Sequence, residues 1–379
     1  MDDVYKKSLD LHRTHKGKIE ISPKVPLENK EDLSLAYTPG VAQASREIGA
    51  DVSKVYEYTI KGNTVAVISD GSAILGLGNL GAHAAIPVME GKAVIFKKFA
   101  GVDAFPICVN TQDVEEIIAL VKNIAPVFGG INLEDISAPR CFEIEARLRK
   151  ELPIPVMHDD QHGTATVVLA GLINSLKLAG KSKENVRIVM SGAGAAGTAI
   201  TNLLLAYGFK NFIVCDSQGA IYEGRPDLNT DKQILAKKTN PEKLQGTLEQ
   251  VLSGADIFVG VSKPGVLTPE MVKTMAEKPI IFALANPIPE IMPNVAIEAG
   301  AFIVATGRSD FPNQINNSLA FPGIFRGALD NRIKQFTEKM FIDAAQALAD
   351  YVQNPKPDQV LPQAFDLGVV DVIKKVIKD

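Results

Sequence analysis

The sequence predicts an α/β protein with a Rossmann-type, doubly wound parallel sheet in its C-terminal part and a second α/β domain before it. Strand-like apolar runs alternate with helix-like stretches along most of the 379 residues. A glycine-rich turn stands between a strand-like run and a helical pattern, and acidic pairs follow two earlier strand-like runs. We place the domains at residues 1–161 and 162–379, with last helices that can pack back on the first domain.

The composition is that of a soluble globular protein, with 46% apolar and 22% charged residues. A net charge of −4 disfavours nucleic acid as a partner. No run reaches the roughly 18 apolar residues that span a membrane, and the N-terminus lacks an apolar signal-peptide core. We therefore expect a cytoplasmic protein with no membrane partner. Three widely spaced cysteines favour reduced core residues over disulfides: Cys108, Cys141 and Cys215.

In the first part, short runs rich in valine and isoleucine predict strands. These runs are Asn63–Ser69, Lys92–Phe96, Ala104–Val109 and Ile131–Leu133. Apolar residues at helical spacing predict a helix over Asp113–Ile124. Ser137 is expected to cap a further helix that has Pro139 in its first turn.

From Gly163 onward the pattern is that of a doubly wound sheet. A long helix is predicted over Thr164–Leu178. The strand-like runs that follow are Val186–Met190, Phe212–Cys215, Ile257–Val261, Ile280–Leu284 and Ala301–Ala305. After Pro322 the chain is predicted to be helical to its end, with a break at residues 354–362.

The glycine-rich turn has the surroundings that a dinucleotide-binding loop requires. It comprises Gly192, Ala193, Gly194, Ala195, Ala196 and Gly197. Its glycines allow, in order, a tight turn, close approach of the backbone to a pyrophosphate, and close packing of helix on strand. Asp216 ends the next strand, where a carboxylate can bind the ribose 2′-hydroxyl. We therefore predict NAD as the cofactor, with NADP left open; a glycine-rich turn without a ligand is the alternative.

Two acidic pairs, Glu134-Asp135 and Asp159-Asp160, each follow a strand-like run, and the ends of neighbouring parallel strands converge. Four carboxylates at one sheet edge would suit Mg²⁺ or Mn²⁺, which prefer oxygen ligands. For either pair alone, a solvated loop or a helix cap is the simpler interpretation. For His158 and His162 a place in a turn or cap is favoured over metal binding. A hard metal beside a nicotinamide site indicates oxidation of a hydroxy acid.

Longer motifs resemble those of the malic enzymes, in the same order along the chain. They are AYTPGVAQ (Ala36–Gln43), VISDGSAILGLGNLG (Val67–Gly81), EGKAVIFKKFAGVDAFPI (Glu90–Ile107), NLED (Asn132–Asp135), HDDQHGTA (His158–Ala165), GAGAAG, FALANP (Phe282–Pro287) and NQINNSLAFPG (Asn313–Gly323). The resemblance, from about residue 20 to 350, is to the short bacterial or archaeal form. It implies oxidative decarboxylation of L-malate to pyruvate and CO₂, with reduction of NAD(P) and a divalent cation.

The resemblance implies catalytic roles for three residues. Tyr37 matches the tyrosine that protonates enolpyruvate, and Lys92 matches the base that contacts the substrate and takes the proton of its C2 hydroxyl. Asp159 matches the carboxylate that tunes this lysine. Without the resemblance, Tyr37 would be interpreted as a packed tyrosine at a turn, and Lys92 as a surface lysine.

The resemblance also implies the ligands of the site. Glu134, Asp135 and Asp160 match the metal ligands, which explains the acidic pairs. Asn286 and Asn317 match asparagines that touch the substrate or the nicotinamide.

One position departs from the family pattern. The larger malic enzymes have an arginine that binds the substrate carboxylate one residue before the Ile-Leu-Gly-Leu-Gly run, where this chain has Ala73. Another donor must bind that carboxylate. The backbone of Gly76–Gly81 is a candidate, because exposed N–H groups can form an anion site.

Other functions stay open on the sequence. They are a metal-dependent dehydrogenase of another 2-hydroxy acid, a malolactic conversion without net redox change, a nucleotide-sensing module, and an amino-acid dehydrogenase that needs no metal. Intact Tyr37 and Lys92 argue against the sensing module. We also expect a homodimer, in which the N-terminal segment can cross to the partner and place Tyr37 in the partner's site.

Overall fold

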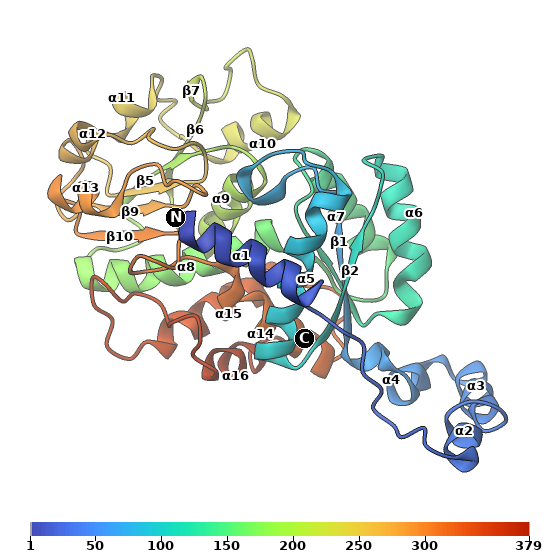
Figure 1. Cartoon of the computed structure of the whole chain (residues 1–379). Coiled ribbons are helices and arrows are strands. Elements are labelled where there is room, and N and C mark those ends of the chain that lie inside the picture. Colours follow the sequence, from blue (N-terminus) through green and yellow to red (C-terminus); the bar gives the residue numbers. More distant parts are fainter. Residues whose placement is uncertain (1, 379) are drawn as a thin grey trace.

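The computed structural model describes residues 2–378, which form two β-sheets with helices on their faces (Figure 1). The four-stranded sheet lies within residues 64–158 and the six-stranded sheet within residues 187–306. The predicted α/β class with a Rossmann-type sheet in the C-terminal part is confirmed. Within the described residues, no helix combines the length and apolarity that crossing a membrane would require.

The first sheet is parallel throughout. Its strands, in spatial order, are β2 (Asp103–Cys108), β1 (Thr64–Ser69), β3 (Gly130–Leu133) and β4 (Val156–His158). Alternate residues of β1 point to opposite faces, so Val65 and Val67 join the core under α5 (Ala82–Ala100). Ala66 and Ile68 join the core under two other helices, α6 (Val114–Ile124) and α7 (Arg140–Glu151). Residues that follow β3 and β4 therefore meet at one edge.

The second sheet is parallel except for its last strand. Its order is β10 (Ile303–Thr306), β9 (Ile280–Ala283), β8 (Ile257–Gly260), β5 (Arg187–Ser191), β6 (Asn211–Asp216) and the antiparallel β7 (Gly219–Ala220). The strand order reverses at β5, which puts a crevice at the carboxyl ends of β5, β6 and β8. The helices around this sheet are α9 (Ala195–Tyr207), α10 (Thr230–Lys238), α11 (Leu248–Leu252), α12 (Pro269–Lys273) and α13 (Pro293–Glu298).

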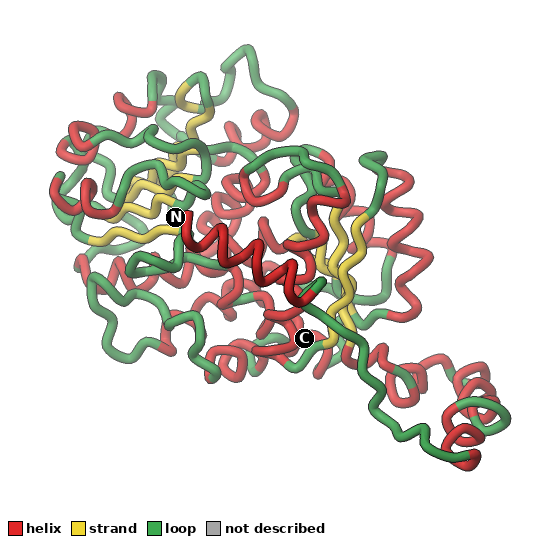
Figure 2. Tube along the Cα trace, viewed as in Figure 1, coloured by secondary structure: helices red, strands yellow, loops and turns green. Residues whose placement is uncertain are grey.

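One long helix connects the two sheets. Helix α8 (Asp159–Ala179) starts directly after β4 of the first sheet and packs against α9 of the second (Figure 2). Its middle residues are buried almost without a break, because α15 (Glu338–Tyr351), the middle one of the three last helices, covers its other side. These last helices are α14 (Phe321–Asp330), α15 and α16 (Gly368–Lys374).

Helix α14 returns to the first sheet. Its Phe321 and Phe325 rings lie 4.6 Å and 5.4 Å from the ring of Phe96 in α5. The short helix η5 (Asn317–Leu319) precedes it and packs on α8. The last part of the chain thus contacts helices of both sheets.

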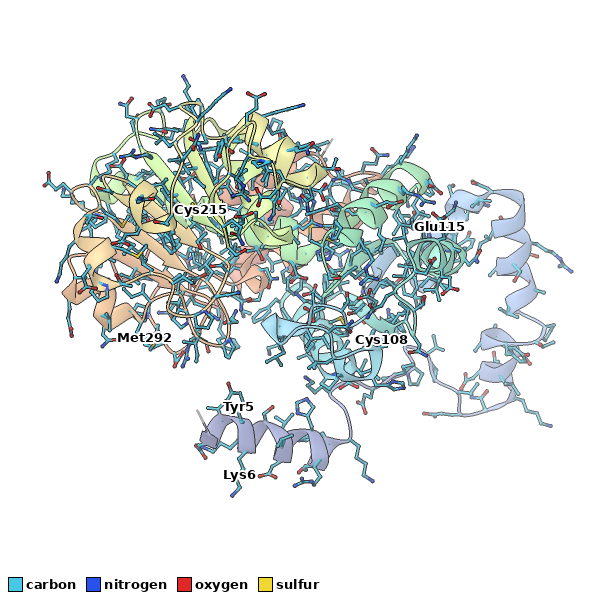
Figure 3. The ribbon with its side chains drawn as sticks, turned by 90° about the horizontal axis from the view of Figure 1, so that it is seen from above. Tyr5, Lys6, Cys108, Glu115, Cys215 and Met292 are labelled. Atoms are coloured by element: carbon cyan, nitrogen blue, oxygen red, sulfur yellow. The ribbon has the colours of Figure 1, made fainter. Side chains whose placement is uncertain are left out.

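The first part of the chain, residues 2–60, forms an arm that stands away from the body (Figures 1 and 3). Helix α1 (Asp2–His15), which carries Tyr5, lies apart from the body in Figure 3. The next helices have no buried residue: α2 (Lys30–Ala36), α3 (Val41–Ala50) and α4 (Val55–Tyr58). The arm is attached to α5 near Lys18, whose backbone N–H donates to Glu90 Oε2 at 3.0 Å. Many apolar side chains of this N-terminal arm are exposed, among them Val4, Leu9, Ile21 and Leu35.

Three predictions of local structure are wrong. Residues 92–96 are not a strand but part of α5, whose buried residues recur at helical spacing over a longer run. Ser137 does not cap α7, which begins at Arg140; its hydroxyl accepts a hydrogen bond from the Arg140 guanidinium at 3.0 Å. Helix α8 begins at Asp159 and not at Thr164. The other predicted strands lie within two residues of the observed ones.

Candidate active site

Lys92 projects from α5 into the acidic residues at the carboxyl end of the first sheet. Its Nζ is 2.6 Å from Asp159 Oδ2 and 2.8 Å from Glu134 Oε1. The same ammonium lies 4.3 Å from the ring centroid of Phe321, a residue that the sequence analysis did not single out although its motif was noted. Lys92 is only 7% exposed, so these interactions are shielded from water.

The structure brings the two acidic pairs together. Glu134 and Asp135 follow β3, and Asp159 and Asp160 form the first turn of α8, where the helix dipole favours negative charge. The backbone N–H of Asp135 donates to Asp160 Oδ2 at 2.9 Å. Asp135 has a φ of +53°, a left-handed conformation that aspartate tolerates better than most residues.

Burial and mutual repulsion raise the pKa of three of these carboxyls. Burial raises the pKa of Glu134 well above its usual range, although Lys92 opposes the shift. Burial, reinforced by the charge of Asp160, raises the pKa of Asp135 to about 7. Burial also raises the pKa of Asp159. Burial alone would lower the pKa of Lys92, but the surrounding carboxylates outweigh it and raise this pKa. The cluster therefore holds more negative charge than one lysine balances.

The donor set fits a hard divalent cation. Glu134, Asp135 and Asp160 supply carboxylate oxygens, and Asp135 Oδ2 is buried without a hydrogen-bond partner. An added cation would offset the repulsion within the cluster. Among residues 2–378 as they stand, no three His, Cys, Asp or Glu side chains are arranged to hold a metal ion, and Glu134 is turned toward Lys92.

The two histidines beside the acidic pair contact Glu145 of α7. His162 Nε2 is 2.9 Å from Glu145 Oε1, and its ring stacks on Phe341 at 4.7 Å. The backbone N–H of His158 donates to the same oxygen at 3.1 Å. His158 Nδ1 lies 3.8 Å from Asp160 Oδ2, beyond hydrogen-bond distance. These contacts hold the start of α8, as expected for residues of a turn or cap.

A glycine-rich loop joins the acidic cluster to Asn286. The backbone N–H of Ala73 donates to the carbonyl oxygen of Asp135 at 2.9 Å. Three residues later, a Cβ on Gly76 would lie 2.8 Å from the carbonyl oxygen of Asn286. The loop that was expected to bind the substrate carboxylate is therefore in contact with both sides of the site.

Asn317, in η5, lies close to the start of α8, where Asp159 and Gly163 are one helical turn apart. A Cβ at position 163 would lie 3.1 Å from Cβ of Asn317 and only 1.9 Å from Asp159 Oδ1. Glycine is required there because any side chain would displace one of these neighbours. Asn317 thus reaches the cluster from the last part of the chain.

Tyr37, a predicted catalytic residue, is not brought to the cluster within the described chain. It ends helix α2 on the N-terminal arm and is 67% exposed. The arm carries it away from the carboxyl end of the first sheet (Figure 1).

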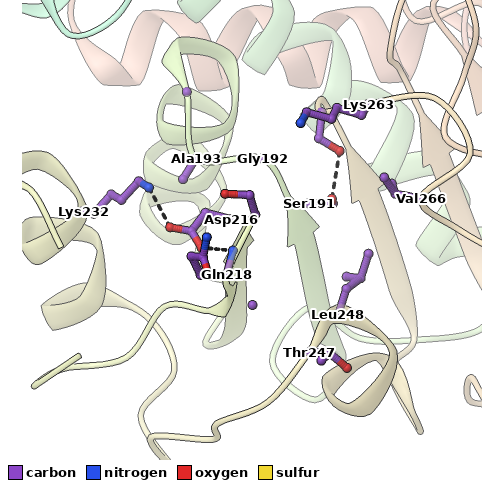
Figure 4. A pocket seen from close by; sticks show the side chains of 14 residues that line it. Ser191, Gly192, Ala193, Asp216, Gln218, Lys232, Thr247, Leu248, Lys263 and Val266 are labelled. Atoms are coloured by element: carbon purple, nitrogen blue, oxygen red, sulfur yellow. Dashed lines mark hydrogen bonds and ion pairs between the residues drawn. The ribbon is translucent and has the colours of Figure 1, made fainter. Parts of the chain in front are cut away.

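A separate cavity of about 630 Å³ lies at the carboxyl ends of the second sheet (Figure 4). It is lined by Ser191, Gly192, Ala193, Gly194, Asp216, Ser217, Gln218, Gly219, Lys232, Thr247, Leu248, Ser262, Lys263 and Val266. Gly192 has a φ of +118°, and a Cβ on Gly197 would lie 1.9 Å from the carbonyl oxygen of Gly192. These two glycines allow the turn and the close approach of α9 that a dinucleotide loop needs.

Asp216 has two basic partners that the sequence analysis missed. Arg225 donates to both of its carboxylate oxygens, at 3.0 Å and 2.5 Å, and Lys232 donates at 2.6 Å. The backbone N–H of Gln218 adds a further bond at 2.9 Å (Figure 4). Despite partial burial, these donors lower the pKa of Asp216 to about 2. In the sequence, Arg225 and Lys232 differ from other basic residues only in following Asp216 at a short distance along the chain. That distance alone does not predict a contact.

A Rossmann-type pocket and a buried lysine and carboxylate cluster in one chain are the features of an NAD(P)-dependent oxidoreductase. Residues 161–376 match the model of the malic enzyme NAD-binding domain, and residues 16–114 and 109–149 match that of the malic enzyme N-terminal domain.

Individual relatives agree with these matches. The chain is 57% identical to the bifunctional malic/malolactic enzyme of Bacillus subtilis, over 98% of this chain and 91% of the relative. It is 52% identical to the NADP-dependent malic enzyme of Rhizobium meliloti, over 93% of this chain and 46% of the relative. The crystal structure of the NAD-dependent malic enzyme of Thermotoga maritima superposes with a TM-score of 0.95, at 52% identity and 98% coverage of both chains. The chain belongs to the malic enzyme family.

Proposed function

We propose that this enzyme oxidises L-malate with NAD(P)⁺ and decarboxylates the product to pyruvate and CO₂. The observation that carries the proposal is the buried Lys92 between Asp159 and Glu134, in a chain that also holds a dinucleotide pocket. Tyr37, Asn286 and Asn317 are assigned to the site by their match to the family motifs.

Each residue has one task in this mechanism. Lys92 is protonated among the carboxylates, so it first passes a proton to Asp159, 2.6 Å away, and then accepts the proton of the C2 hydroxyl. The C2 hydride would pass to a nicotinamide bound in the dinucleotide pocket, which would take up the two electrons that malate loses. The resulting β-keto acid loses its C4 carboxyl as CO₂, and the electron pair of the C3–C4 bond remains in an enolate. Tyr37 then donates a proton at C3 to give pyruvate. Glu134, Asp135 and Asp160 would hold a divalent cation, which when bound polarises the oxygen at C2.

We propose that the enzyme is a homodimer and that Tyr37 acts in the partner's site. The exposed apolar residues of the N-terminal arm and the position of Tyr37 on it support this. Lys92→Ala and Tyr37→Phe should each be inactive alone. Mixed in equal amounts and allowed to exchange, they should regain about a quarter of wild-type activity, because half of the dimers then have one intact site. No recovery after proven exchange would mean that each chain uses its own tyrosine.

The ribose end of the pocket supports use of both cofactors. Asp216 alone favours NAD, but its oxygens are already occupied by Arg225 and Lys232. Lys232 lines the pocket and retains donors that a 2′-phosphate can accept. We therefore propose that NADP is accepted beside NAD, which revises the preference predicted from Asp216.

The test of the main proposal is an assay with purified protein, L-malate and Mg²⁺ or Mn²⁺, with each cofactor. Equal amounts of reduced cofactor and pyruvate are expected. Reduction without pyruvate would indicate a dehydrogenase of malate or another 2-hydroxy acid.

A malolactic conversion is the second candidate, because the Bacillus subtilis relative is named as bifunctional. Such a reaction would release lactate and leave no net reduced cofactor. Lactate measured in the same assay separates the two activities.

A further inference from the structure

Glu290 is a buried carboxylate outside the catalytic cluster. It lies in the loop after β9 and is 0% exposed, and the partners of its two oxygens among the described residues are backbone N–H groups. Its Oε1 accepts the backbone N–H of Ser262 at 2.8 Å, and its Oε2 accepts that of Ala285 at 3.0 Å. Both oxygens act as acceptors, which is the arrangement of an ionised carboxylate.

The two segments that Glu290 joins both belong to the site. Ser262 follows β8 and lines the dinucleotide cavity, and its hydroxyl is 2.9 Å from that of Ser191, next to the glycine-rich turn. Ala285 directly precedes Asn286, which the family motifs place at the substrate or the nicotinamide. One side chain thus ties the wall of the cofactor cavity to the asparagine loop.

The fold makes room for this side chain. A Cβ on Gly260, at the end of β8, would lie 2.5 Å from Cδ of Glu290. A buried carboxylate without a cation costs free energy, and burial accordingly raises the pKa of Glu290 against its backbone hydrogen bonds. A neutral side chain would avoid this cost, so packing alone does not explain the choice of glutamate.

We propose that Glu290 is a positioning residue that fixes the Ser262 and Asn286 segments relative to each other for dinucleotide binding and hydride transfer. This inference rests on the proposed function. Glutamine fills the same space but offers one acceptor in place of two, so Glu290→Gln should release one of the two segments.

The matched control is Asp256→Asn. Asp256 directly precedes β8, the strand that ends at Gly260, and it lies away from the cofactor cavity. It also accepts a backbone N–H, that of Arg187 at 2.8 Å, and it pairs with Lys181 at 2.7 Å. A variant Glu290→Asp, which keeps the charge but shortens the side chain, is measured beside Glu290→Gln and secures the test if the latter does not fold.

Two quantities are measured that do not depend on the folded fraction. They are the Kd for NADH or NADPH, from nicotinamide fluorescence, and the primary isotope effect on kcat/KM with 2-deuterated malate. We expect both Glu290 variants to bind the reduced cofactor roughly tenfold more weakly and to show a larger isotope effect, because hydride transfer becomes slower. Asp256→Asn should match the wild type in both.

Unchanged Kd and isotope effect in the Glu290 variants would overturn the proposal, as would an equal change in Asp256→Asn. A wild-type protein that binds NADH but does not oxidise malate would overturn the proposed function alone. The Kd comparison would then still decide the role of Glu290.

Discussion

The cluster around Lys92 and the cluster around Asp216 are built from the same kinds of groups, but only the second has its charges balanced. In the first, one lysine lies among carboxylates that exceed it in charge, and burial raises the pKa of Glu134, Asp135 and Asp159. In the second, Asp216 lies between Arg225 and Lys232, Arg225 also pairs with Asp227, and the donors around Asp216 lower its pKa to about 2. The first cluster therefore has an excess of negative charge, which favours an added cation, whereas the charges of the second cluster are paired.

The largest expected effect is on the lysine of the first cluster. Lys92→Ala removes the proposed base, and we expect kcat with malate to fall roughly a thousandfold. Lys97→Ala is the control, because Lys97 lies on the same helix and pairs with Asp103 at the surface. Steady-state assays of both variants decide the matter: near-normal turnover in Lys92→Ala would refute the assignment.

A divalent cation should distinguish the clusters in a stability measurement. At a concentration about a hundredfold above its Kd, Mg²⁺ or Mn²⁺ should stabilise the wild type by about 2–3 kcal/mol, seen as a higher Tm. Asp160→Asn should lose most of this increase, whereas Asp216→Asn should keep it. An equal rise of Tm in all three proteins would place the cation elsewhere.

The second cluster is tested by measuring kcat/KM with NADP and with NAD in a variant of Lys232. Lys232→Gln removes the cation that faces the cavity, so kcat/KM with NADP should fall about tenfold while that with NAD changes little. Lys238 lies on the same helix and donates to Asn202 at the surface, so Lys238→Gln is the matched control. An equal loss of kcat/KM with both cofactors would mean that Lys232 does not distinguish the 2′-phosphate of NADP from the 2′-hydroxyl of NAD.

The smallest expected effect is on stability at the second cluster. The pKa of Asp216 is about 2 in the folded protein, below the value near 3.9 of an unfolded chain. The ionised group therefore stabilises the fold above pH 4, and this contribution is lost as the pH falls from 4 to 2. With solvent screening, Asp216→Asn should cost about 1 kcal/mol at pH 7.

This difference between Asp216→Asn and the wild type should shrink at pH 3. Urea unfolding at both pH values measures it. Asp343→Asn, which breaks an exposed pair with Lys339, should have almost no effect at either pH. A constant difference for Asp216→Asn would show that its charge is not the cause.

The sequence located the first cluster better than the second, for a physical reason. Glu134 and Asp160 follow adjacent parallel strands, so strand order alone brings their positions together. Arg225 and Lys232 reach Asp216 from a loop and from α10, and no periodic pattern predicts where such segments return. Glu290 was missed because its partners are backbone groups, which have no signature in the sequence.

Local predictions failed where tertiary contacts overrule short patterns. Residues 92–96 form an apolar run that fits a strand, but the burial pattern that makes them helical extends over all of α5. Ser137 has the side chain of a good cap, yet its hydroxyl binds Arg140 instead. Tyr37 could be recognised by its motif, and the N-terminal segment was expected to be able to cross to a partner, but no periodic pattern in this segment predicts the path of the arm.

Helix α8 has a mechanical consequence. It is continuous from Asp159 to Ala179, about 31 Å of rod, and it carries two catalytic-cluster carboxylates at one end and packs on the cofactor-binding half along its length. A rod of this kind transmits rotation instead of absorbing it. Any closing movement of the cofactor-binding half about the first sheet would therefore turn Asp159 and Asp160 with it. Binding of the cofactor would in this way change the orientation of these two carboxylates.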